Sequence, residues 1–247
     1  MNLLAFDTST EVLTIAVSRH TDGAPDASHQ TWEYSGAGGA QASATLITQV
    51  LNLLQQAGLG LAALDAICFG CGPGSFTGLR TACAVAQGLA YGAGVPVLPI
   101  DSLLALAEEA RFQTHRDGAP WRVMALLDAR MDEVYAATWD WDGHLWTELQ
   151  TSALLRPEAI AAGDAVLAGN VFGVYATRLG ADHGGLGGSG CVSALPKATA
   201  MLRLAPALIA AGQAVDAAQA LPRYIRDKVA KTTSERELEK AQSRAAL

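Results

Sequence analysis

Apolar and polar positions follow two periods in the first part of the chain. Residues 3–6 form a short apolar run and residues 12–18 alternate with a period of two, which is typical of β-strands. A third strand is predicted near residues 31–34. Residues 41–57 carry apolar side chains three and four positions apart, so they predict a helix, and Gly58 is suited to end it.

Strands and helices then alternate along the rest of the chain. The pattern predicts further strands at residues 66–70, 95–100, 123–127, 134–139, 145–149 and 165–168. It predicts helices at residues 79–91, 103–110, 158–162, 171–179 and 199–212, with Asp101 and Ser102 capping the second and Pro206 entering or kinking the last. The first half therefore has the order βββαβα followed by one more strand and helix, and the second half begins the same order again.

The beginnings of the two halves also resemble each other in sequence. At residues 4–12 an apolar strand ends in Asp7, a short turn follows, and Glu-Val opens an alternating strand. The same arrangement occurs at residues 126–134, where the strand ends in Asp128. We therefore predict one internal duplication.

Two βββαβα units in tandem resemble the duplicated actin-like fold of the superfamily of actin, Hsp70 and sugar kinases (ASKHA), an α/β fold that is ribonuclease H-like. The resemblance implies two subdomains whose hairpin turns face each other across a cleft that holds nucleotide phosphates. We assign residues 1–101 to the first subdomain, completed by the C-terminal helix at residues 199–220. Residues 102–198 form the second subdomain, and residues 221–247 remain as a basic tail that we expect to be flexible.

Composition narrows the functional class. The 247 residues carry a formal net charge of −7, which argues against a protein that binds nucleic acid by itself, because phosphate binding relies on clustered Lys and Arg. The charge is uneven, since residues 221–247 hold seven basic and four acidic residues. No stretch approaches the ~20 apolar residues that span a bilayer, and the N-terminus lacks a basic signal region. We therefore expect a soluble, cytoplasmic protein without membrane contact.

Cysteine and histidine provide no metal or hydrolytic site. Four cysteines in a chain of this length indicate reduced thiols, and the C-x-x-C spacing of Cys68 and Cys71 has no second pair or nearby His to complete a zinc site. The five histidines include no two that are three or four positions apart. No serine or cysteine lies in a nucleophile elbow with a credible His partner. We predict no metal site and no catalytic residue.

The most distinctive local feature is a glycine-rich loop at residues 70–80, between a predicted strand and a predicted helix. Its glycines permit close backbone approach, and N–H groups at a helix start can bind an anion. It lacks the Lys of a Walker A loop, so a tight structural turn is as good an interpretation as a phosphate site. Asp7 and Asp128 are candidate metal or water positioners, although acidic turn residues often serve local hydrogen bonding alone.

Two predicted helices have too little polar surface for an ordinary exposed helix. The helix at residues 79–91 has one charge, Arg80, and small residues in lines, while the helix at residues 41–57 has two apolar stripes. Half of all residues are apolar and only 17% are charged, which also favours a partner surface. Both helices are either sandwiched inside the domain or form a dimer face, and the pattern alone leaves these alternatives open.

Four motifs together resemble the bacterial TsaB (YeaZ) family in order and spacing over nearly the whole chain. They are AFDTST at residues 5–10, GPGSFTGLR at 72–80, DARMDEVY at 128–135 and PRYIR at 222–226. The resemblance implies an accessory subunit required for N6-threonylcarbamoyladenosine formation beside the tRNA anticodon. Its implied partners are the metal-binding transferase TsaD in a heterodimer, the ATPase TsaE in the ternary complex, and a second copy in a homodimer, with tRNA bound only through the complex.

The resemblance also implies two sets of residues. It implies no cofactor bound tightly by this chain alone, with ATP or ADP only in the complex. The vestigial nucleotide or phosphate cleft comprises Asp7, Thr8, Ser9, Thr10, Gly74, Ser75, Asp128 and Gly169. The partner interface, on the two helices of the first half, comprises Leu46, Val50, Leu53, Ala82, Val85, Ala86 and Leu89.

One position departs from the family pattern, because many members carry His where this chain has Ala42. Two alternatives to the accessory subunit remain open. The first is an active enzyme of the actin-like fold, either an ATP-using phosphotransferase or a glycoprotease-like peptidase. The second assigns tRNA contact to the basic segment at residues 221–247, against a solvated chain end.

Overall fold

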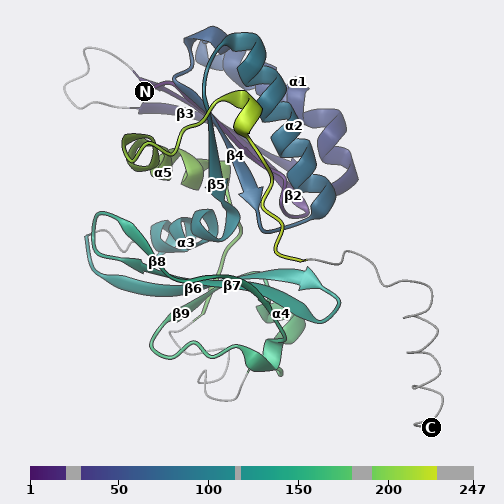
Figure 1. The fold of residues 1–247 in the computed structure, drawn as a ribbon, viewed down its shortest axis with the longest axis vertical. Helices are drawn as coiled ribbons and strands as arrows, with labels where there is room; N and C mark the ends of the chain where they lie inside the picture. Colours follow the sequence, from purple (N-terminus) through teal and green to yellow (C-terminus); the bar gives the residue numbers. More distant parts are fainter. Residues whose placement is uncertain (21–28, 115–117, 180–190, 227–247) are drawn as a thin grey trace, which may run out of the picture.

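The computed structural model describes residues 1–20, 29–114, 118–179 and 191–226. These residues form two α/β subdomains, one above the other in Figure 1, each built on a five-stranded sheet. The predicted fold class is therefore confirmed.

The first sheet is mixed. Its first three strands pair antiparallel, and the other two continue from the central strand in parallel. Every residue of the central strand is buried, because helices cover both faces of the sheet. In sheet order the strands are β3 (His29–Ala37), β2 (Val12–His20), β1 (Leu3–Asp7), β4 (Ala66–Gly72) and β5 (Val97–Asp101).

The second sheet repeats this arrangement, with the same parallel and antiparallel neighbours. This correspondence confirms the predicted duplication. One of its strands, β10, was not predicted, because it has only three residues and little pattern to detect. In the matching order the strands are β8 (Trp146–Leu155), β7 (Glu133–Trp141), β6 (Trp121–Arg130), β9 (Val166–Gly169) and β10 (Cys191–Ser193).

Helices cover the outer faces of the two sheets unequally. Helices α1 (Ala42–Ala57) and α2 (Phe76–Ala93) lie side by side on the outer face of the first sheet (Figure 1). The second sheet carries only the 3-10 turn η3 (Pro157–Ala159) and the single-turn helix α4 (Phe172–Tyr175) in the corresponding layer. The outer layer of the second subdomain is therefore thin.

Two sequence predictions were wrong in this thin layer. The helix predicted at residues 158–162 is only a 3-10 turn, because Pro157 and Gly163 bracket a segment too short to nucleate an α-helix. The helix predicted at residues 171–179 is four residues long. Gly173 within it and the β-branched residues around it disfavour a longer helix.

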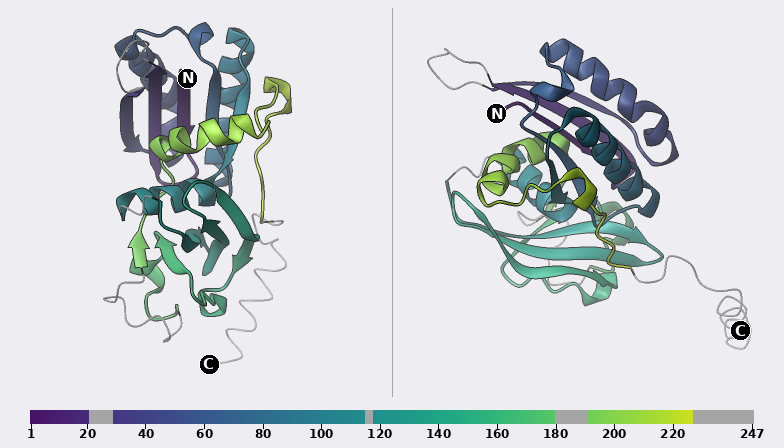
Figure 2. Two further views of the ribbon diagram at one scale, coloured as in Figure 1. Left: turned by 90° about the vertical axis from the view of Figure 1, so that its left-hand side faces the viewer. Right: turned by 45° about the horizontal axis from the view of Figure 1, so that its top comes forward.

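The two sheets share a central layer formed by helices α3 (Ser102–Gln113) and α5 (Ala198–Ala210), which lie between them (Figure 2). Helix α5 packs on β1 and β2, whereas α3 contacts strands of both sheets and α5 itself. After α5, Val215 pairs with Val97 and the 3-10 turn η5 (Ala217–Gln219) packs on α2. The chain thus returns to the first subdomain after building the second.

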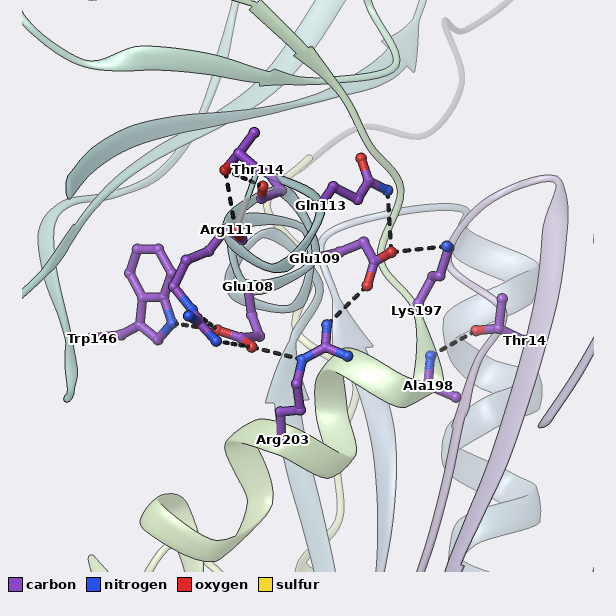
Figure 3. A network of polar contacts seen from close by, with 11 residues as sticks. Thr14, Glu108, Glu109, Arg111, Gln113, Thr114, Trp146, Lys197, Ala198 and Arg203 are labelled. Carbon is purple, nitrogen blue, oxygen red and sulfur yellow. Dashed lines mark hydrogen bonds and ion pairs between the residues drawn. The ribbon is translucent and has the colours of Figure 1, made fainter. Parts of the chain in front are cut away.

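Helix α3 buries two adjacent carboxylates, Glu108 and Glu109, in this central layer. Glu108 accepts two hydrogen bonds from Arg111, at 2.8 and 2.9 Å, and one from Arg203 on α5 at 2.7 Å. The indole N–H of Trp146 donates to the same carboxylate at 3.1 Å. Figure 3 shows how these donors converge on the carboxylate from α3, α5 and β8.

The second carboxylate, Glu109, is also surrounded by donors. Its carboxylate pairs with Arg203 at 2.9 Å and with Lys197 at 2.8 Å, and it accepts a hydrogen bond from the Gln113 side chain at 3.1 Å (Figure 3). Burial acts to raise the pKa of Glu109, but these hydrogen bonds outweigh it and hold the pKa below its ordinary value. Both buried charges are therefore compensated, and Arg203, which contacts both, ties α5 to α3.

The predicted partner interface needs correction. The resemblance places its members on the two helices of the first half, but most of them face the first sheet and form the core under α1 and α2, as does Ala42. A helix that covers a sheet must bury one apolar stripe in its own subdomain before any other stripe can meet a partner. Five of the seven residues are buried in this way, namely Leu46, Val50, Leu53, Ala82 and Ala86, while Val85 and Leu89 are half-buried.

The predicted boundary of the tail at residue 221 also needs correction. Residues 221–226 are part of the described structure and contact both subdomains. Residues 227–247 lie outside the described residues.

Candidate functional site

A cavity of about 640 Å³ lies between the two subdomains. Its wall is formed by the turn after β1, the start of α2, the turn between β6 and β7, part of α4 and the end of the described chain. Five of the eight predicted cleft residues line this cavity, namely Ser9, Thr10, Gly74, Ser75 and Asp128.

The other three predicted cleft residues do not line it. Asp7 and Thr8 are completely buried beneath the glycine-rich loop. Gly169 is buried in β9, where a side chain would collide with the carbonyl oxygen of Leu126. The sequence placed these residues correctly at strand ends but could not tell which of them face the cleft.

The carboxylate of Asp7 organises the first turn locally. Its Oδ1 accepts hydrogen bonds from the Ser9 backbone N–H at 2.9 Å and the Ser9 hydroxyl at 2.7 Å. Its Oδ2 has no hydrogen-bond partner among the described residues, and neither does the hydroxyl of buried Ser102. Burial raises the pKa of Asp7 to about 6, against the opposing effect of the two hydrogen bonds from Ser9.

The glycine-rich loop packs directly on this first turn. The Ser75 backbone N–H donates to the Ser9 carbonyl at 2.7 Å, and the Thr8 hydroxyl donates to the Gly78 carbonyl at 2.7 Å. A Cβ at Gly74 would lie 2.5 Å from the Cβ of Ser9, and one at Gly78 would collide with the Thr8 carbonyl oxygen. The two glycines are required because the loop and the turn are in backbone contact. This finding favours the interpretation of the motif as a tight structural turn over a phosphate site.

This packing occupies groups that a phosphate would need. The Ser75 N–H, at the start of α2, is bonded to the first turn, and the Ser75 hydroxyl caps α2 by accepting from the Gly78 N–H at 3.4 Å. An anion site at a helix start depends on such N–H groups being directed at the ligand. In this chain the loop instead stabilises the first turn.

The second turn is more open, and Asp128 faces the cavity. Its Oδ1 accepts from the Tyr175 hydroxyl at 3.0 Å and from the Arg130 N–H at 2.9 Å. Burial has the larger effect in raising the pKa of Tyr175, and the hydrogen bond to Asp128 raises it further. The side-chain carbonyl of Asn170 accepts from the Asp128 N–H at 2.9 Å. Asp128 therefore serves chiefly to hold its turn.

Three successive residues of the second turn, Arg130, Met131 and Asp132, have positive φ angles of 61, 56 and 60°. Such a run is unfavourable for residues other than glycine and must be held by its surroundings. Arg178 donates to Asp132 at 2.8 Å and to Glu158 at 2.5 Å. The two turns are thus related by duplication but stabilised by different contacts.

Many residues of the cavity wall are not in the predicted set, among them four polar residues away from the two predicted turns. Asn170 follows the end of β9, and Arg223, Tyr224 and Arg226 belong to the C-terminal segment that crosses the cleft. The sequence pointed to Arg223, Tyr224 and Arg226 only through the PRYIR motif. That motif indicated a family but did not show that these residues lie at the cleft.

The C-x-x-C spacing does not produce a redox or metal pair. Cys68 belongs to the core between the two sheets, whereas Cys71 belongs to the core under α1 and α2, so the two thiols lie on opposite faces of β4. Burial raises the pKa of both thiols to about 12, which makes them unreactive. Within the described ranges, no group of three or more His, Cys, Asp and Glu residues is arranged to hold a metal ion.

The described part of the chain contains no helix that could span a membrane. None of its helices has both the length and the apolar character needed to cross a bilayer.

Comparison with known proteins identifies close relatives. A family model described as "TsaD: tRNA N6-adenosine threonylcarbamoyltransferase" matches residues 39–242. The tRNA threonylcarbamoyladenosine biosynthesis protein TsaB of Escherichia coli is 33% identical over 237 residues, which cover 93% of this chain and 96% of that protein. TsaB of Haemophilus influenzae is 39% identical over 140 residues, or 55% of this chain and 52% of the relative.

A solved structure agrees with these matches. YeaZ from Pseudomonas aeruginosa is 35% identical and superposes with a TM-score of 0.76, covering 90% of this chain and 99% of that one.

Substituting Gly78 by Ala tests the packing of the glycine-rich loop. The new methyl group would collide with the Thr8 carbonyl, so we expect a loss of about 1–3 kcal/mol in the free energy of unfolding. Gly88 lies in the same helix with open space around it, and Gly88→Ala should instead stabilise the protein by about 0.5–1 kcal/mol. Urea unfolding measures both, and equal effects would contradict the packing argument.

Substituting Asp7 by Asn tests the buried carboxyl. Folding raises the pKa of Asp7 from 3.8 to about 6, so the folded protein favours the protonated carboxyl. The free energy of unfolding is therefore highest below about pH 4, where the carboxyl is protonated in both states, and it falls as the pH rises through 6. The neutral amide avoids this loss, so Asp7→Asn should be more stable than the parent at pH 7, by up to about 3 kcal/mol.

At pH 4 that advantage of Asp7→Asn should disappear. Thermal unfolding between pH 4 and pH 8 measures it, with the exposed Asp164→Asn as the matched control. A parallel pH dependence of parent and Asp7→Asn would refute the assignment.

Proposed function

Because this chain belongs to the TsaB (YeaZ) family, which acts in tRNA threonylcarbamoyladenosine biosynthesis, we propose that it serves there as a non-catalytic subunit that binds and activates a TsaD transferase. The E. coli relative is matched over nearly its whole length, and the matching family model carries the TsaD description. The chain therefore matches both a TsaD family model and a protein named TsaB in sequence.

The observation that carries this proposal is the closed first turn. Phosphoryl-transfer chemistry needs a carboxylate that can reach a metal ion or a water molecule in the cleft. Asp7 is completely buried, and Gly74 and Gly78 bring the loop into backbone contact with the turn that contains it. Only Asp128 of the two strand-end acids faces the cavity, and its oxygens are engaged by Tyr175 and Arg130.

The alternative of a peptidase has less support. A hydrolytic nucleophile needs a base within hydrogen-bond reach, which in most such sites is His. Among the described residues, the cavity wall includes Ser9 and Ser75 but no His, Cys or Lys. The Ser9 hydroxyl donates to Asp7, and the Ser75 hydroxyl caps α2.

For the partner surface we propose the outer face of α1 and α2, beside the buried stripe rather than on it. Ile47 and Leu51 project from α1 with 47% and 49% of their surface exposed. On α2, Gly88 and Gly92 have open space above them, which permits close approach of another helix. This face would form the heterodimer with TsaD and the homodimer, with TsaE joining the assembly and tRNA bound only through the complex.

We propose no tightly bound cofactor for the chain alone, with ATP or ADP entering only in the complex. The cytoplasm, where tRNA is modified, is the proposed location.

Substituting Leu51 by Glu tests the surface. An unpaired charge in the centre of a helix interface is strongly unfavourable, so we expect dimerisation and TsaD binding to weaken at least tenfold. Leu145→Glu is the matched control, because Leu145 is 55% exposed on the other subdomain. Sedimentation velocity measures both variants after circular dichroism has shown that they fold. Association that is unchanged in Leu51→Glu would exclude this face.

Threonylcarbamoyl transfer to tRNA by purified proteins tests whether this chain is a non-catalytic subunit. Threonylcarbamoyl adenylate and tRNA are supplied to this chain alone, to TsaD with TsaE, and to all three proteins together. We expect modified tRNA only from the complete mixture, with Asp128→Asn supporting transfer within about twofold of the parent. Product from this chain alone, or loss of product with a folded Asp128→Asn variant, would contradict a non-catalytic role.

A further inference from the structure

The last six described residues, 221–226, cross the mouth of the cleft from the first subdomain to the second. In Figure 1 they form the yellow segment that descends from η5 toward the second sheet. They supply part of the cavity wall through Arg223, Tyr224, Ile225 and Arg226. This segment is therefore placed to connect the two hairpin turns.

The upper end of the segment is anchored to the first subdomain through its backbone. The Arg223 N–H donates to the Cys71 carbonyl at 2.7 Å, next to the end of β4. The contact is so close that a Cβ at Gly72 would lie 2.5 Å from the Arg223 carbonyl oxygen. Tyr224 adds a side-chain anchor on α2, because its hydroxyl accepts from Arg80 at 2.9 Å.

Asp101 links the same end to the central layer. Its Oδ1 caps α3 by accepting from the Leu103 N–H at 2.7 Å, and its Oδ2 pairs with Arg223 at 3.0 Å. One largely buried carboxylate thus holds the start of α3 and the C-terminal segment together.

The lower end is anchored to the second turn by Arg226. Its guanidinium donates to the Ala129 carbonyl at 2.8 Å and pairs with Glu133 at 2.8 Å, and it contacts the Met131 sulfur at 3.1 Å. Only 14% of its side chain is exposed. Arg226 therefore holds both sides of the turn that contains the three positive φ angles.

Another link across the cleft, the ion pair between Glu11 and Arg130, is weaker. These side chains are 81% and 65% exposed, and exposed pairs contribute little because water and salt screen them. The C-terminal segment has a backbone hydrogen bond at one end and a largely buried guanidinium at the other. Of these two links at the cleft mouth, the segment is the stronger constraint.

We propose that residues 221–226 act as an interdomain latch that fixes the width of the cleft by tying the end of β4 to the turn between β6 and β7. The latch is a property of this chain alone and does not depend on the proposed partners. Loss of either anchor frees the two turns to move apart about the central layer.

Distance measurement by electron paramagnetic resonance tests the latch in the full chain. Spin labels are placed at Thr77→Cys on α2 and Thr151→Cys on β8, both exposed positions, after Cys191→Ser removes the half-buried native thiol. Arg223→Gln combined with Arg226→Gln removes the side-chain anchors. We expect the distance distribution of this variant to broaden or shift relative to the parent.

Two controls separate the latch from other effects. Arg178→Gln loosens the same turn without crossing the cleft, and a chain ending at Arg226 lacks residues 227–247 but keeps the latch. Both should retain the parent distribution. Identical distributions in all variants, or an equal change in Arg178→Gln, would overturn the proposal.

Hydrogen exchange keeps the test decisive if the double variant does not fold. In Arg226→Lys the ammonium group can still pair with Glu133. It lacks the planar guanidinium that binds this carboxylate and the Ala129 carbonyl at the same time. If the segment acts as one unit, this change should accelerate exchange of the Arg223 amide at least about tenfold. Exchange that is unchanged at Arg223 would show that the two anchors are independent, which overturns the latch.

Discussion

The fold depends on the contact between two helices that lie between the two sheets. Helices α3 and α5 fill the space between the sheets, so ten of the twelve residues of α3 are buried. Burying Glu108 and Glu109 there would be prohibitive without partners, because an unpaired charge in the interior costs several kcal/mol. Arg203, contacting both carboxylates from α5, makes the arrangement of the two helices specific.

This shared layer leaves the two subdomains unequal. The first sheet is covered on its outer face by two long helices with an apolar outer stripe, and the second by little more than single turns. The cleft is likewise asymmetric, because the glycine-rich loop closes the first turn while the second turn stays open. The two halves of the duplicated fold therefore differ at the cleft, and this difference is the basis of the proposed non-catalytic role.

Much of the fold could be predicted because its signals are local. The period-two strands, the long helix that ends at Gly58 and the cap at Asp101 each depend on neighbours in sequence, and the Asp-turn-Glu-Val echo revealed the duplication. The predictions that were wrong concerned weak local signals. The short segments after Pro157 and around Gly173 have helical periodicity but too little length or propensity to form a helix without strong packing.

The sequence by itself determined the α/β class, the repeat, the family and the residues at the two strand ends. Only the tertiary structure decided which of those residues face the cleft, because burial depends on elements far apart in the chain. Asp7 is buried by a loop some 70 residues later, and Leu46 and Ala86 are buried by the sheet rather than by a partner. The crossing of the cleft by Arg223 and Arg226 is likewise long-range, since it joins the end of the described chain to β4 and to the second turn.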